Sequence, residues 1–199
     1  MKKLLVWMVI VAGILYFLHG RKQPVKNFPN NNRVVVAFGD SLTEGYGAPE
    51  GESYPDVLAR KINRPVINLG LAGDTAANAP TRLGSVLAEK PYMVLIEFGG
   101  NDRMHQQSRQ VAIQAVSQIV DEVQKAGAIA VIVDTGGPGM DEYTKAYKKI
   151  AKEKNALFVP GILKGIFYKP SLKSDQVHPN AAGYVKVSEK VYKVIKDYL

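Results

Sequence analysis

One histidine in this sequence has the neighbours that a general base requires. His178 follows Asp175 by three residues and stands just before a predicted helix. One turn of chain brings positions i and i+3 to one side, so Asp175 can accept a hydrogen bond from the Nδ1–H group of His178. That bond would fix the tautomer and leave Nε2 facing a nucleophile. The other two histidines are less suited, because His19 lies in an apolar N-terminal run and His105 in a predicted loop.

The nucleophile for such a base is predicted to be Ser41. It ends the tripeptide GDS, which follows an apolar run over residues 34–38 that predicts a buried strand. Two further predicted strands run into similar sequences, NLGLAGD over residues 68–74 and GGND over residues 99–102. Glycine lets the backbone approach a ligand closely, and Asn101 adds a side-chain amide. A serine hydrolase needs donors of this kind for the developing oxyanion.

Each of these features also has an ordinary structural explanation. The tripeptide GDS and the tetrapeptide GGND are common in turns. The segment from Asp175 to Asn180 could be a plain helix start, with Asn180 as its N-cap. The combination is far more specific than any part, because the features fall at three strand ends and in one late loop in this order. Together they favour a Ser–His–Asp hydrolase.

The predicted elements would bring these residues to one place. Apolar runs predict strands, and helical patterns separate them: strands over 34–38, 65–69, 93–98, 129–133 and 157–159, helices over 54–62, 75–89, 108–126, 141–154 and 180–198. Strands that are apolar throughout and alternate with helices indicate a parallel sheet covered on both faces. In such a sheet the ligand site lies at the carboxyl ends of the strands.

The same motifs resemble those of the SGNH (GDSL) hydrolase family over essentially all of residues 34–199. The matching blocks are FGDSLTEGYG over 38–47, NLGLAG over 68–73 with Asp74 and Thr75 following, GGND over 99–102 and DQVHPN over 175–180. The sequence is most similar to the bacterial arylesterase, thioesterase and lysophospholipase branch. The resemblance implies an α/β protein with a three-layer α/β/α, flavodoxin-like fold, here with a five-stranded parallel sheet.

The resemblance also implies roles for individual residues. Ser41 would be the nucleophile and His178 the base that Asp175 orients. The oxyanion hole would consist of the backbone N–H groups of Ser41 and Gly73 and the side chain of Asn101. The implied substrates are small-molecule acyl esters, thioesters or lysophospholipids, and no metal or organic cofactor is implied.

Residues next to these motifs are the candidates for substrate contact. The candidates are Asp40, Leu42, Arg103, His105 and Gly137. The stretches RMHQQ over residues 103–107 and GGPGM over 136–140 follow no familiar pattern of the family. They are expected to line the acyl or leaving-group pocket, so the identity of the substrate stays open.

Three other functions fit part of the pattern. A carbohydrate or peptidoglycan O-acetylesterase would use the same triad with a shallower, more polar pocket. An inactive binding or scaffold domain would have no physical need for the complete set of Ser41, Gly73, Asn101, Asp175 and His178. A flavin- or nucleotide-binding domain would need a phosphate loop such as GxGxxG after the first strand, where this sequence has GDSLTEGYG.

The net charge of +8 belongs largely to the N-terminal segment. Residues 1–33 carry six basic residues and no acidic one, which leaves 20 basic against 18 acidic groups in residues 34–199. This distribution argues against a nucleic-acid partner and for a membrane surface. The absence of cysteine excludes a disulfide framework and a thiolate nucleophile.

An apolar run over residues 4–18 predicts a membrane segment. Two lysines precede it and two basic residues follow it closely, but no small-residue pattern suited to cleavage comes after it. We therefore expect an uncleaved signal-anchor. A cleaved signal peptide and a buried N-terminal helix of the domain are the alternatives.

The predicted domain organisation follows from this segment. Residues 1–20 would be the signal-anchor, residues 21–33 a linker rich in proline and asparagine, and residues 34–199 the hydrolase domain. We expect a monomer anchored in the cytoplasmic membrane with its catalytic domain on the periplasmic or extracellular side. A secreted or periplasmic protein is the alternative if the segment is cleaved.

Overall fold

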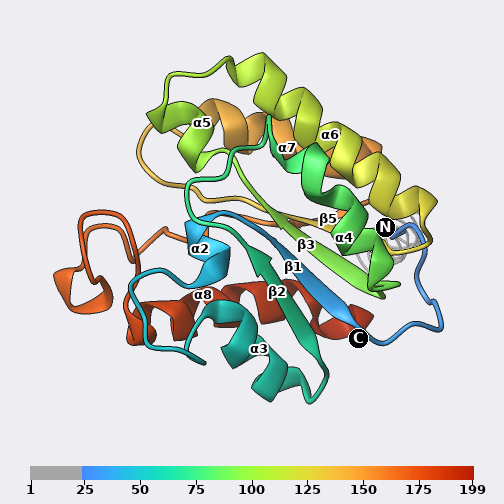
Figure 1. The fold of residues 1–199 in the computed structure, drawn as a ribbon, viewed down its shortest axis with the longest axis horizontal. Helices are drawn as coiled ribbons and strands as arrows, with labels where there is room; N and C mark the ends of the chain where they lie inside the picture. The colour runs from blue at the N-terminus through green and yellow to red at the C-terminus, as the bar shows by residue number, and fades with distance from the viewer. Residues whose placement is uncertain (1–23) are drawn as a thin grey trace, which may run out of the picture.

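The computed structural model describes residues 24–199, and these form a sheet between two layers of helices (Figure 1). The sheet has five strands in the order β2-β1-β3-β4-β5, and every pair of neighbours is parallel. This is the strand order of flavodoxin-like folds. The predicted three-layer α/β/α fold with a five-stranded parallel sheet is confirmed.

The strands are short and apolar. Their bounds are Val35–Gly39 (β1), Val66–Gly70 (β2), Met93–Glu97 (β3), Ile129–Val133 (β4) and Leu157–Val159 (β5). All five residues of β1, of β3 and of β4 are buried, whereas those of the edge strand β2 are half-buried. Full burial of the central strands explains why their sequences show no polar alternation.

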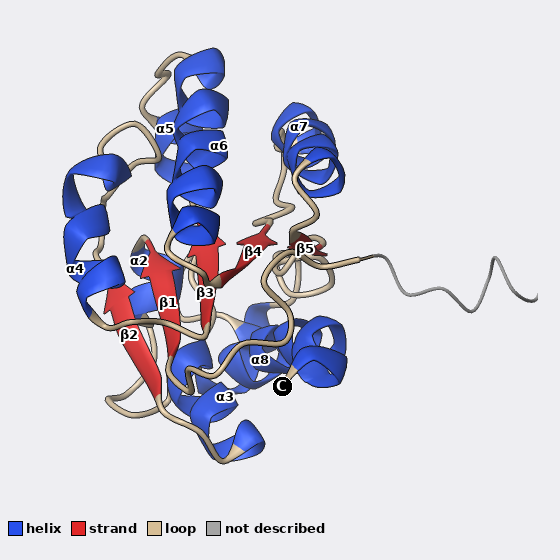
Figure 2. Ribbon diagram, turned by 90° about the vertical axis from the view of Figure 1, so that its right-hand side faces the viewer, coloured by secondary structure: helices blue, strands red, loops and turns tan. Residues whose placement is uncertain are grey.

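Helices cover both faces of the sheet (Figure 2). One face carries α3 (Tyr54–Ile62) and α8 (Ala181–Ile195), and the other carries α4 (Leu83–Ala88), α6 (Arg109–Lys125) and α7 (Asp141–Glu153). Side chains of a strand point alternately to the two faces. In β1, Val36 and Phe38 join the core under α6 and α7, while Val35 and Ala37 join the core under α3 and α8.

Short helical segments lie at the ends of these elements. The structure has the α-helices α2 (Ser41–Glu44) and α5 (Gly100–Met104), and the 3-10 helices η1 (Ala79–Arg82), η2 (Pro170–Leu172) and η3 (Lys196–Tyr198). The two α-helices follow β1 and β3 directly, so they stand at the carboxyl edge of the sheet. They begin inside the GDS and GGND motifs.

The helix predicted over residues 75–89 is shorter in the structure. Residue 75 has no regular structure, residues 76–78 form a turn, and only η1 and α4 are helical. The carboxylate of Asp102 accepts hydrogen bonds from the backbone N–H groups of Ala76, at 2.8 Å, and Ala77, at 3.2 Å. Pro80 lacks an N–H group to continue a helix. The hydrogen bonds to Asp102 and the proline together explain why the helical structure begins only after residue 78.

Residues 24–33 pack against the amino-terminal edge of the sheet. Asn27 Nδ2 donates to the carbonyl oxygens of Gln124, at 2.7 Å, and Ala128, at 2.9 Å. Asn30 Nδ2 donates to the carbonyl of Tyr92 at 3.1 Å. Residues 24–33 are therefore hydrogen-bonded to segments that lie 62 to 101 positions later in the chain.

The expected location of the protein needs a correction. Among residues 24–199, no helix is long and apolar enough to cross a membrane. The expectation of a protein anchored in the cytoplasmic membrane is therefore wrong on this finding. The run over residues 4–18, on which that expectation rested, lies outside the described residues, as does the predicted segment 1–20.

Candidate active site

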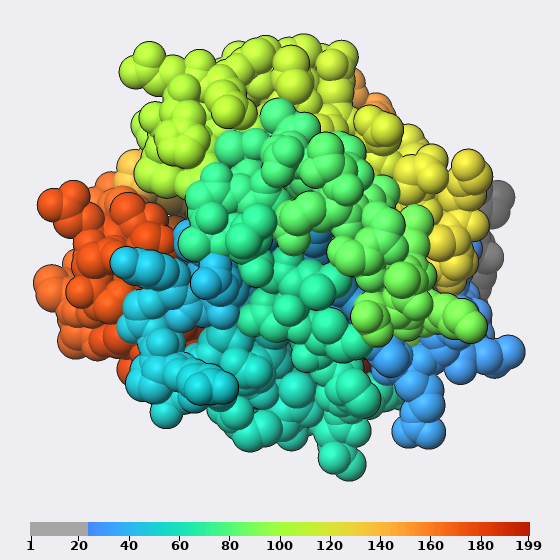
Figure 3. All heavy atoms as spheres, in the orientation of Figure 1, coloured from blue at the N-terminus to red at the C-terminus, as the bar shows by residue number. Residues whose placement is uncertain are grey.

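The motifs that follow β1, β2 and β3 meet the late loop at the carboxyl edge of the sheet. In Figure 1 this edge lies at the left, where α2 and α5 face the loop between β5 and α8. The space-filling view in Figure 3 shows the segment after β1 directly beside this later loop. Segments from the beginning and the end of the domain thus form one surface.

Ser41, His178 and Asp175 form a continuous hydrogen-bonded chain on this surface. The Ser41 Oγ lies 3.0 Å from His178 Nε2, and His178 Nδ1 lies 2.8 Å from Asp175 Oδ2. In the tautomer with the proton on Nδ1, the imidazole donates to Asp175 and accepts from the Ser41 hydroxyl. The three residues predicted as a triad are therefore in contact, in the order that proton transfer requires.

The loop that carries Asp175 and His178 is itself held by hydrogen bonds. Asp175 Oδ1 accepts from the backbone N–H groups of Val177 and His178, both at 2.7 Å. Ser174 N donates to the carbonyl of His178 at 3.0 Å. One carboxylate thus orients the histidine backbone with one oxygen and the imidazole with the other.

These contacts determine the ionisation of Asp175. Burial raises the pKa of its carboxyl group, but the N–H groups of His178 and Val177 and the His178 ring outweigh this and lower the pKa to about 2. The side chain is 43% exposed, against 20% for His178. Asp175 is therefore ionised at neutral pH and can stabilise an imidazolium ion.

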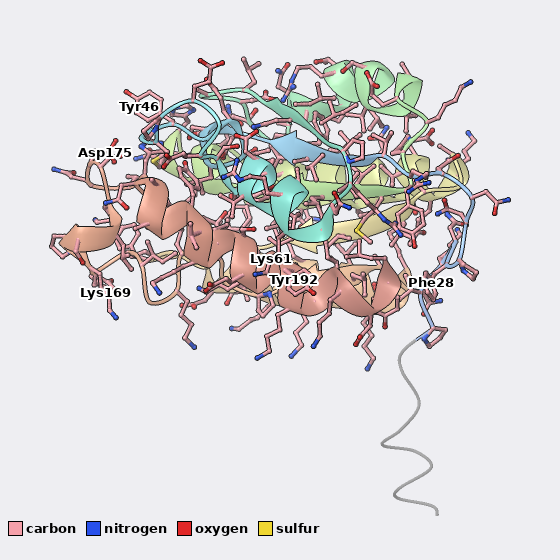
Figure 4. All side chains as sticks on the ribbon, turned by 90° about the horizontal axis from the view of Figure 1, so that it is seen from below. Phe28, Tyr46, Lys61, Lys169, Asp175 and Tyr192 are labelled. Atoms are coloured by element: carbon pink, nitrogen blue, oxygen red, sulfur yellow. The ribbon has the colours of Figure 1, made fainter. Side chains whose placement is uncertain are left out.

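An aromatic residue outside the predicted site packs on the histidine. The rings of Tyr46 and His178 are 4.6 Å apart with an interplanar angle of 52°. Figure 4 shows Tyr46 and Asp175 at the same end of the molecule. Tyr46 is 55% exposed, so it shields one face of the imidazole from water while reaching the surface itself. Its place inside the block GDSLTEGYG was the only signal for it in the sequence.

Local geometry explains why Ser41 follows glycine and aspartate. Asp40 is the N-cap of α2, and its Oδ1 accepts from Leu42 N at 2.9 Å. A Cβ atom at Gly39 would lie 2.1 Å from Thr43 Oγ1 and 2.7 Å from the carbonyl oxygen of Glu97. Glycine is therefore required for α2 to turn back onto β3, and the turn puts Ser41 in the first position of the helix.

Two of the predicted oxyanion donors have free N–H groups. Within residues 24–199, the backbone N–H groups of Ser41 and Gly73 donate to no backbone or side-chain acceptor. Gly73 has a φ of +80°, which favours glycine, and open space beside it. Asn101 differs, because its Nδ2 donates to the carbonyl of Asp74 at 2.8 Å and to Asp40 Oδ2 at 3.3 Å.

The loop that carries Gly73 is fixed by a buried ion pair. Arg82 Nε donates to Asp74 Oδ2 at 2.9 Å, and Arg82 Nη2 contacts the same oxygen. Arg82 Nη1 also donates to the carbonyl of Leu69 at 3.1 Å. The guanidinium therefore connects the end of β2 to the loop behind Gly73, a role that sequence reasoning did not assign.

A cleft of about 210 Å³ opens beside Ser41. Of the residues proposed for substrate contact, Asp40, Leu42, Arg103 and Gly137 line it together with Ser41, Asn101 and His178. Gly73 and His105 are not among its lining residues. His105 is exposed at the end of α5, where its N–H group donates to the carbonyl of Asn101 at 2.8 Å.

The other residues that line the cleft are mostly apolar. Met104, Pro138 and Met140 belong to the stretches 103–107 and 136–140, which were expected to line the pocket. Leu163, Phe167 and Val177 were not singled out in the sequence, and they come from the segment after β5, whose location at the carboxyl edge was their only signal. Among residues 24–199, no group of three or more histidine, aspartate or glutamate side chains is arranged to bind a metal ion.

Comparison with known proteins places this geometry in context. The family model described as "GDSL-like Lipase/Acylhydrolase family" matches residues 37–186. The chain is 29% identical over 156 residues to thioesterase 1/protease 1/lysophospholipase L1 of Escherichia coli (strain K12), which covers 73% of this chain and 75% of the relative.

Two solved structures extend the comparison. AlinE4, described as an SGNH-hydrolase family esterase, is 32% identical with a TM-score of 0.65, and the match covers 84% of this chain and 95% of AlinE4. The crystal structure of TesA has a TM-score of 0.79 at 24% identity and covers 84% of this chain and 100% of that one. Both solved structures therefore share the fold of this chain over most of its length.

Proposed function

The chain belongs to the GDSL-like lipase/acylhydrolase family of ester-hydrolysing enzymes, and we propose that it cleaves carboxylic esters or thioesters through a Ser41–His178–Asp175 triad and an acyl-enzyme. The observation that carries this proposal is the contact of 3.0 Å between Ser41 Oγ and His178 Nε2 at a cleft with apolar walls. A serine hydroxyl is a weak nucleophile unless an adjacent base removes its proton.

Acylation would proceed in two steps. Ser41 Oγ attacks the carbonyl carbon of the substrate while His178 Nε2 accepts the hydroxyl proton, which gives a tetrahedral oxyanion and an imidazolium ion. The imidazolium then gives this proton to the departing alkoxide or thiolate, and the carbonyl re-forms as an ester on Ser41. Asp175 holds the imidazolium through the contact of 2.8 Å.

Deacylation repeats the sequence with water. His178 Nε2 accepts a proton from water as its oxygen attacks the acyl carbon, and the second tetrahedral intermediate collapses when the proton returns to Ser41 Oγ. The products are a carboxylic acid and the free enzyme. The 20% exposure of the His178 side chain leaves room for this water.

The oxyanion would be stabilised by three donors. The free N–H groups of Ser41 and Gly73 are two of them, and the Asn101 amide is the third. Asn101 makes a short contact to the Asp74 carbonyl and a long one of 3.3 Å to Asp40. We propose that the oxyanion shares or replaces the longer contact, because that hydrogen bond of 3.3 Å is longer and weaker than an ordinary N–H···O bond.

The walls of the cleft favour an apolar acyl group. Leu42, Met104, Leu163 and Phe167 give it an apolar lining, which suits an alkyl or aryl ester better than a polar sugar acetate. The name of the Escherichia coli relative, which includes thioesterase and lysophospholipase, supports the same substrate class. An O-acetylesterase acting on carbohydrate or peptidoglycan is the alternative predicted from the sequence.

A substrate series tests the proposal. We expect turnover of p-nitrophenyl esters to rise with acyl length beyond acetate, and Ser41→Ala to abolish both turnover and labelling by a fluorophosphonate. Labelling of Ser41→Ala at the wild-type rate would exclude Ser41 as the nucleophile. Faster deacetylation of xylan or peptidoglycan than of any p-nitrophenyl ester would favour the alternative function.

A further inference from the structure

A buried carboxyl group that the proposed mechanism does not use lies directly behind the nucleophile. Glu97 is the last residue of β3, and its side chain is 0% exposed. Glu97 pairs in the sheet with Gly39 of β1, and Gly39 lies two positions before Ser41. No lysine or arginine is hydrogen-bonded or ion-paired to Glu97 within residues 24–199. A carboxylate in such a place is costly unless it is neutral or well hydrogen-bonded.

The partners of Glu97 come from the ends of two strands: Asp40 and Thr43 follow β1, and Thr135 follows β4. Thr43 Oγ1 donates to Glu97 Oε2 at 3.1 Å, and Thr135 Oγ1 donates to Glu97 Oε1 at 3.1 Å. The third partner is the carboxyl group of Asp40, which is 2% exposed. Two carboxyl groups can hydrogen-bond to each other only when one of them carries a proton. A proton shared by Asp40 and Glu97 would therefore satisfy both carboxyl groups between β1 and β3.

Asp40 connects the Asp40–Glu97 pair to the candidate active site. Its Oδ1 accepts from Leu42 N at 2.9 Å, and its Oδ2 accepts from Asn101 Nδ2 at 3.3 Å. Asp40 thus contacts the residue after the nucleophile and the side chain proposed to bind the oxyanion. A shift of the Asp40 carboxyl group would move both Ser41 and Asn101.

We propose that Glu97 is a positioning residue, a neutral carboxylic acid whose O–H group donates to Asp40 and so holds Ser41 and Asn101 in the geometry for ester hydrolysis. This inference rests on the proposed function of Ser41. Glu97 is not among the residues that line the cleft, whereas its partners Asp40 and Thr135 are, so it would act on the site through them.

A neutral acid suits this position better than a second carboxylate. Thr43 and Thr135 donate to the two oxygens of Glu97, so the O–H group of a protonated Glu97 stays free to donate to Asp40. The Asp40–Glu97 pair then carries one negative charge instead of two near the place where the oxyanion develops. Burial and the nearness of Asp40 raise the pKa of Glu97 well above its ordinary value, which agrees with this assignment. The hydrogen bond from Glu97 also occupies an acceptor position of Asp40, so Asp40 holds the Asn101 amide only through the long contact.

Infrared spectroscopy tests the protonation directly. At neutral pH we expect the wild-type protein to show the carbonyl stretch of a buried protonated carboxyl group, and Glu97→Gln to lack it. Glu97→Asp and the surface change Glu153→Gln on α7 serve as controls for band position and for loss of an exposed carboxylate. Absence of the band from the wild-type spectrum would overturn the proposal.

Kinetics test the positioning role with two replacements of similar size. Glu97→Gln keeps a donor for Asp40 and an acceptor for one of the two threonines, so we expect kcat within about tenfold of the wild-type value. Glu97→Leu removes the donor, and a displacement of the catalytic groups then lowers kcat about 10²-fold with little change in KM. The rate of fluorophosphonate labelling at Ser41 should fall in parallel, because it reports nucleophile geometry without the substrate.

The outcomes separate the possible failures. A folded Glu97→Leu protein with wild-type kcat and labelling rate would mean that Glu97 only stabilises the fold. A loss of kcat in Glu97→Gln as large as in Glu97→Leu would show that an ionisable group is needed, against the proposal. If Glu97→Leu does not fold, Thr43→Val removes one hydroxyl from the same network, and its kcat must fall at unchanged KM. Absence of labelling in the wild-type protein would instead refute the proposed function, while the infrared band could still be present.

Discussion

His178 and His105 both follow strand ends, but only His178 contacts the Ser41 hydroxyl. His105 lies outside the cleft and interacts through its backbone N–H group. We therefore expect His178→Ala to lower kcat by about 10⁴- to 10⁶-fold, as losses of a triad base do. His105→Ala should leave kcat within a fewfold of wild type and act, if at all, on KM or acyl preference. Steady-state kinetics on one p-nitrophenyl ester measure both, and losses of equal size would refute the assignment of the base.

The Asn101 side chain offers a second test at the scale of one group. Removal of an oxyanion donor costs about 10²–10³ in kcat, or roughly 3 kcal/mol of transition-state stabilisation. We expect this loss for Asn101→Ala, with the protein still folded and KM little changed. The matched control is Asn68→Ala, because Asn68 lies in β2 and, among residues 24–199, its side chain bonds to the Glu44 carbonyl, to Ser53 and to Gly70 N. A wild-type kcat for Asn101→Ala would show that the amide only braces the loop.

The Asp40–Glu97 pair predicts a pH dependence of stability. Burial raises the pKa of Asp40 to about 6. Burial and the neighbouring carboxyl group of Asp40 raise the pKa of Glu97 well above its ordinary value. A group whose pKa is raised by folding stabilises the protein most below its unfolded pKa, and this contribution is lost as pH rises through the folded pKa. The other ionisable groups that influence the pair come from α3, α5, α7, α8 and the late loop: Tyr54, Asp102, Tyr147, Tyr184 and His178.

The measurement is urea unfolding of the wild-type protein and of Glu97→Gln across pH. From about pH 4 upward through about 6, the free energy of unfolding of the wild-type protein should fall relative to that of the variant. Above the folded pKa values the difference should become constant. Parallel curves over the whole range would contradict a proton bound between Asp40 and Glu97.

At the scale of elements, long apolar patterns were read correctly from the sequence. The helix predicted over residues 54–62 has those bounds in α3, and the strand predicted over residues 129–133 has those of β4. Both begin and end at local signals, such as Ser53, which caps α3 in a capping box. Strands that are buried on both faces leave an unambiguous apolar run.

Short elements at the site were missed because tertiary contacts form them. Helix α2 has four residues, too few for a periodic pattern, and depends on Asp40 as its cap. The turns after Gly73 depend on Asp102, which lies about 25 positions later. The same limit applies to the cleft, because Leu163 and Phe167 reach it from a loop with no motif. The roles of Glu97 and Arg82 could not be predicted from the sequence for the same reason, because these roles depend on partners that are distant in sequence.

Arg82 allows a prediction about one loop. Its guanidinium joins Asp74 to the carbonyls of Leu69 and Gly39 and lies 4.9 Å from the ring of Phe38. Arg82→Ala would leave the buried Asp74 carboxylate without its cation, which costs about 3 kcal/mol. The loop with Gly73 would also lose its support, so kcat of the folded fraction should fall.

The control for this variant is an exposed arginine. Arg60→Ala on α3 removes a guanidinium whose one hydrogen bond goes to the carbonyl of Gly51, so stability and kcat should both stay close to wild type. Urea unfolding and kcat measured below the unfolding transition give the two quantities. A stable Arg82→Ala protein with full kcat would show that the loop keeps its geometry without the ion pair.

At the scale of the whole molecule, the two edges of the sheet have different tasks. The carboxyl edge carries the candidate site, and its loops hold exposed apolar side chains such as Tyr46, Leu71 and Met104. The amino edge is covered by residues 24–33, and Phe28 lies at the end of the molecule away from Tyr46 and Asp175 (Figure 4). Changes at the amino edge should therefore alter stability without altering turnover.

The segment over residues 24–33 provides the test. Its side-chain contacts include four hydrogen bonds from asparagines to carbonyls at the amino edge, and the edge-to-face contact of Phe28 with Tyr198 at 5.2 Å. Each hydrogen bond contributes about 1 kcal/mol and the ring pair a similar amount. A protein that begins at residue 34 should therefore be about 3–5 kcal/mol less stable than one that begins at residue 24.

Urea unfolding of these two proteins measures the difference, and kcat/KM on a small ester should be the same for both at temperatures where each is folded. Asn27→Ala within the longer protein isolates the largest contribution, because Asn27 alone bonds to both Gln124 and Ala128. It should account for about half of the loss, since it removes two of the four hydrogen bonds. Equal stability of the two proteins would place the boundary of the folding unit at residue 34, as the sequence suggested. A loss of kcat/KM in the shorter protein while it remains folded would instead mean that the amino edge is coupled to the site through β1 and β3.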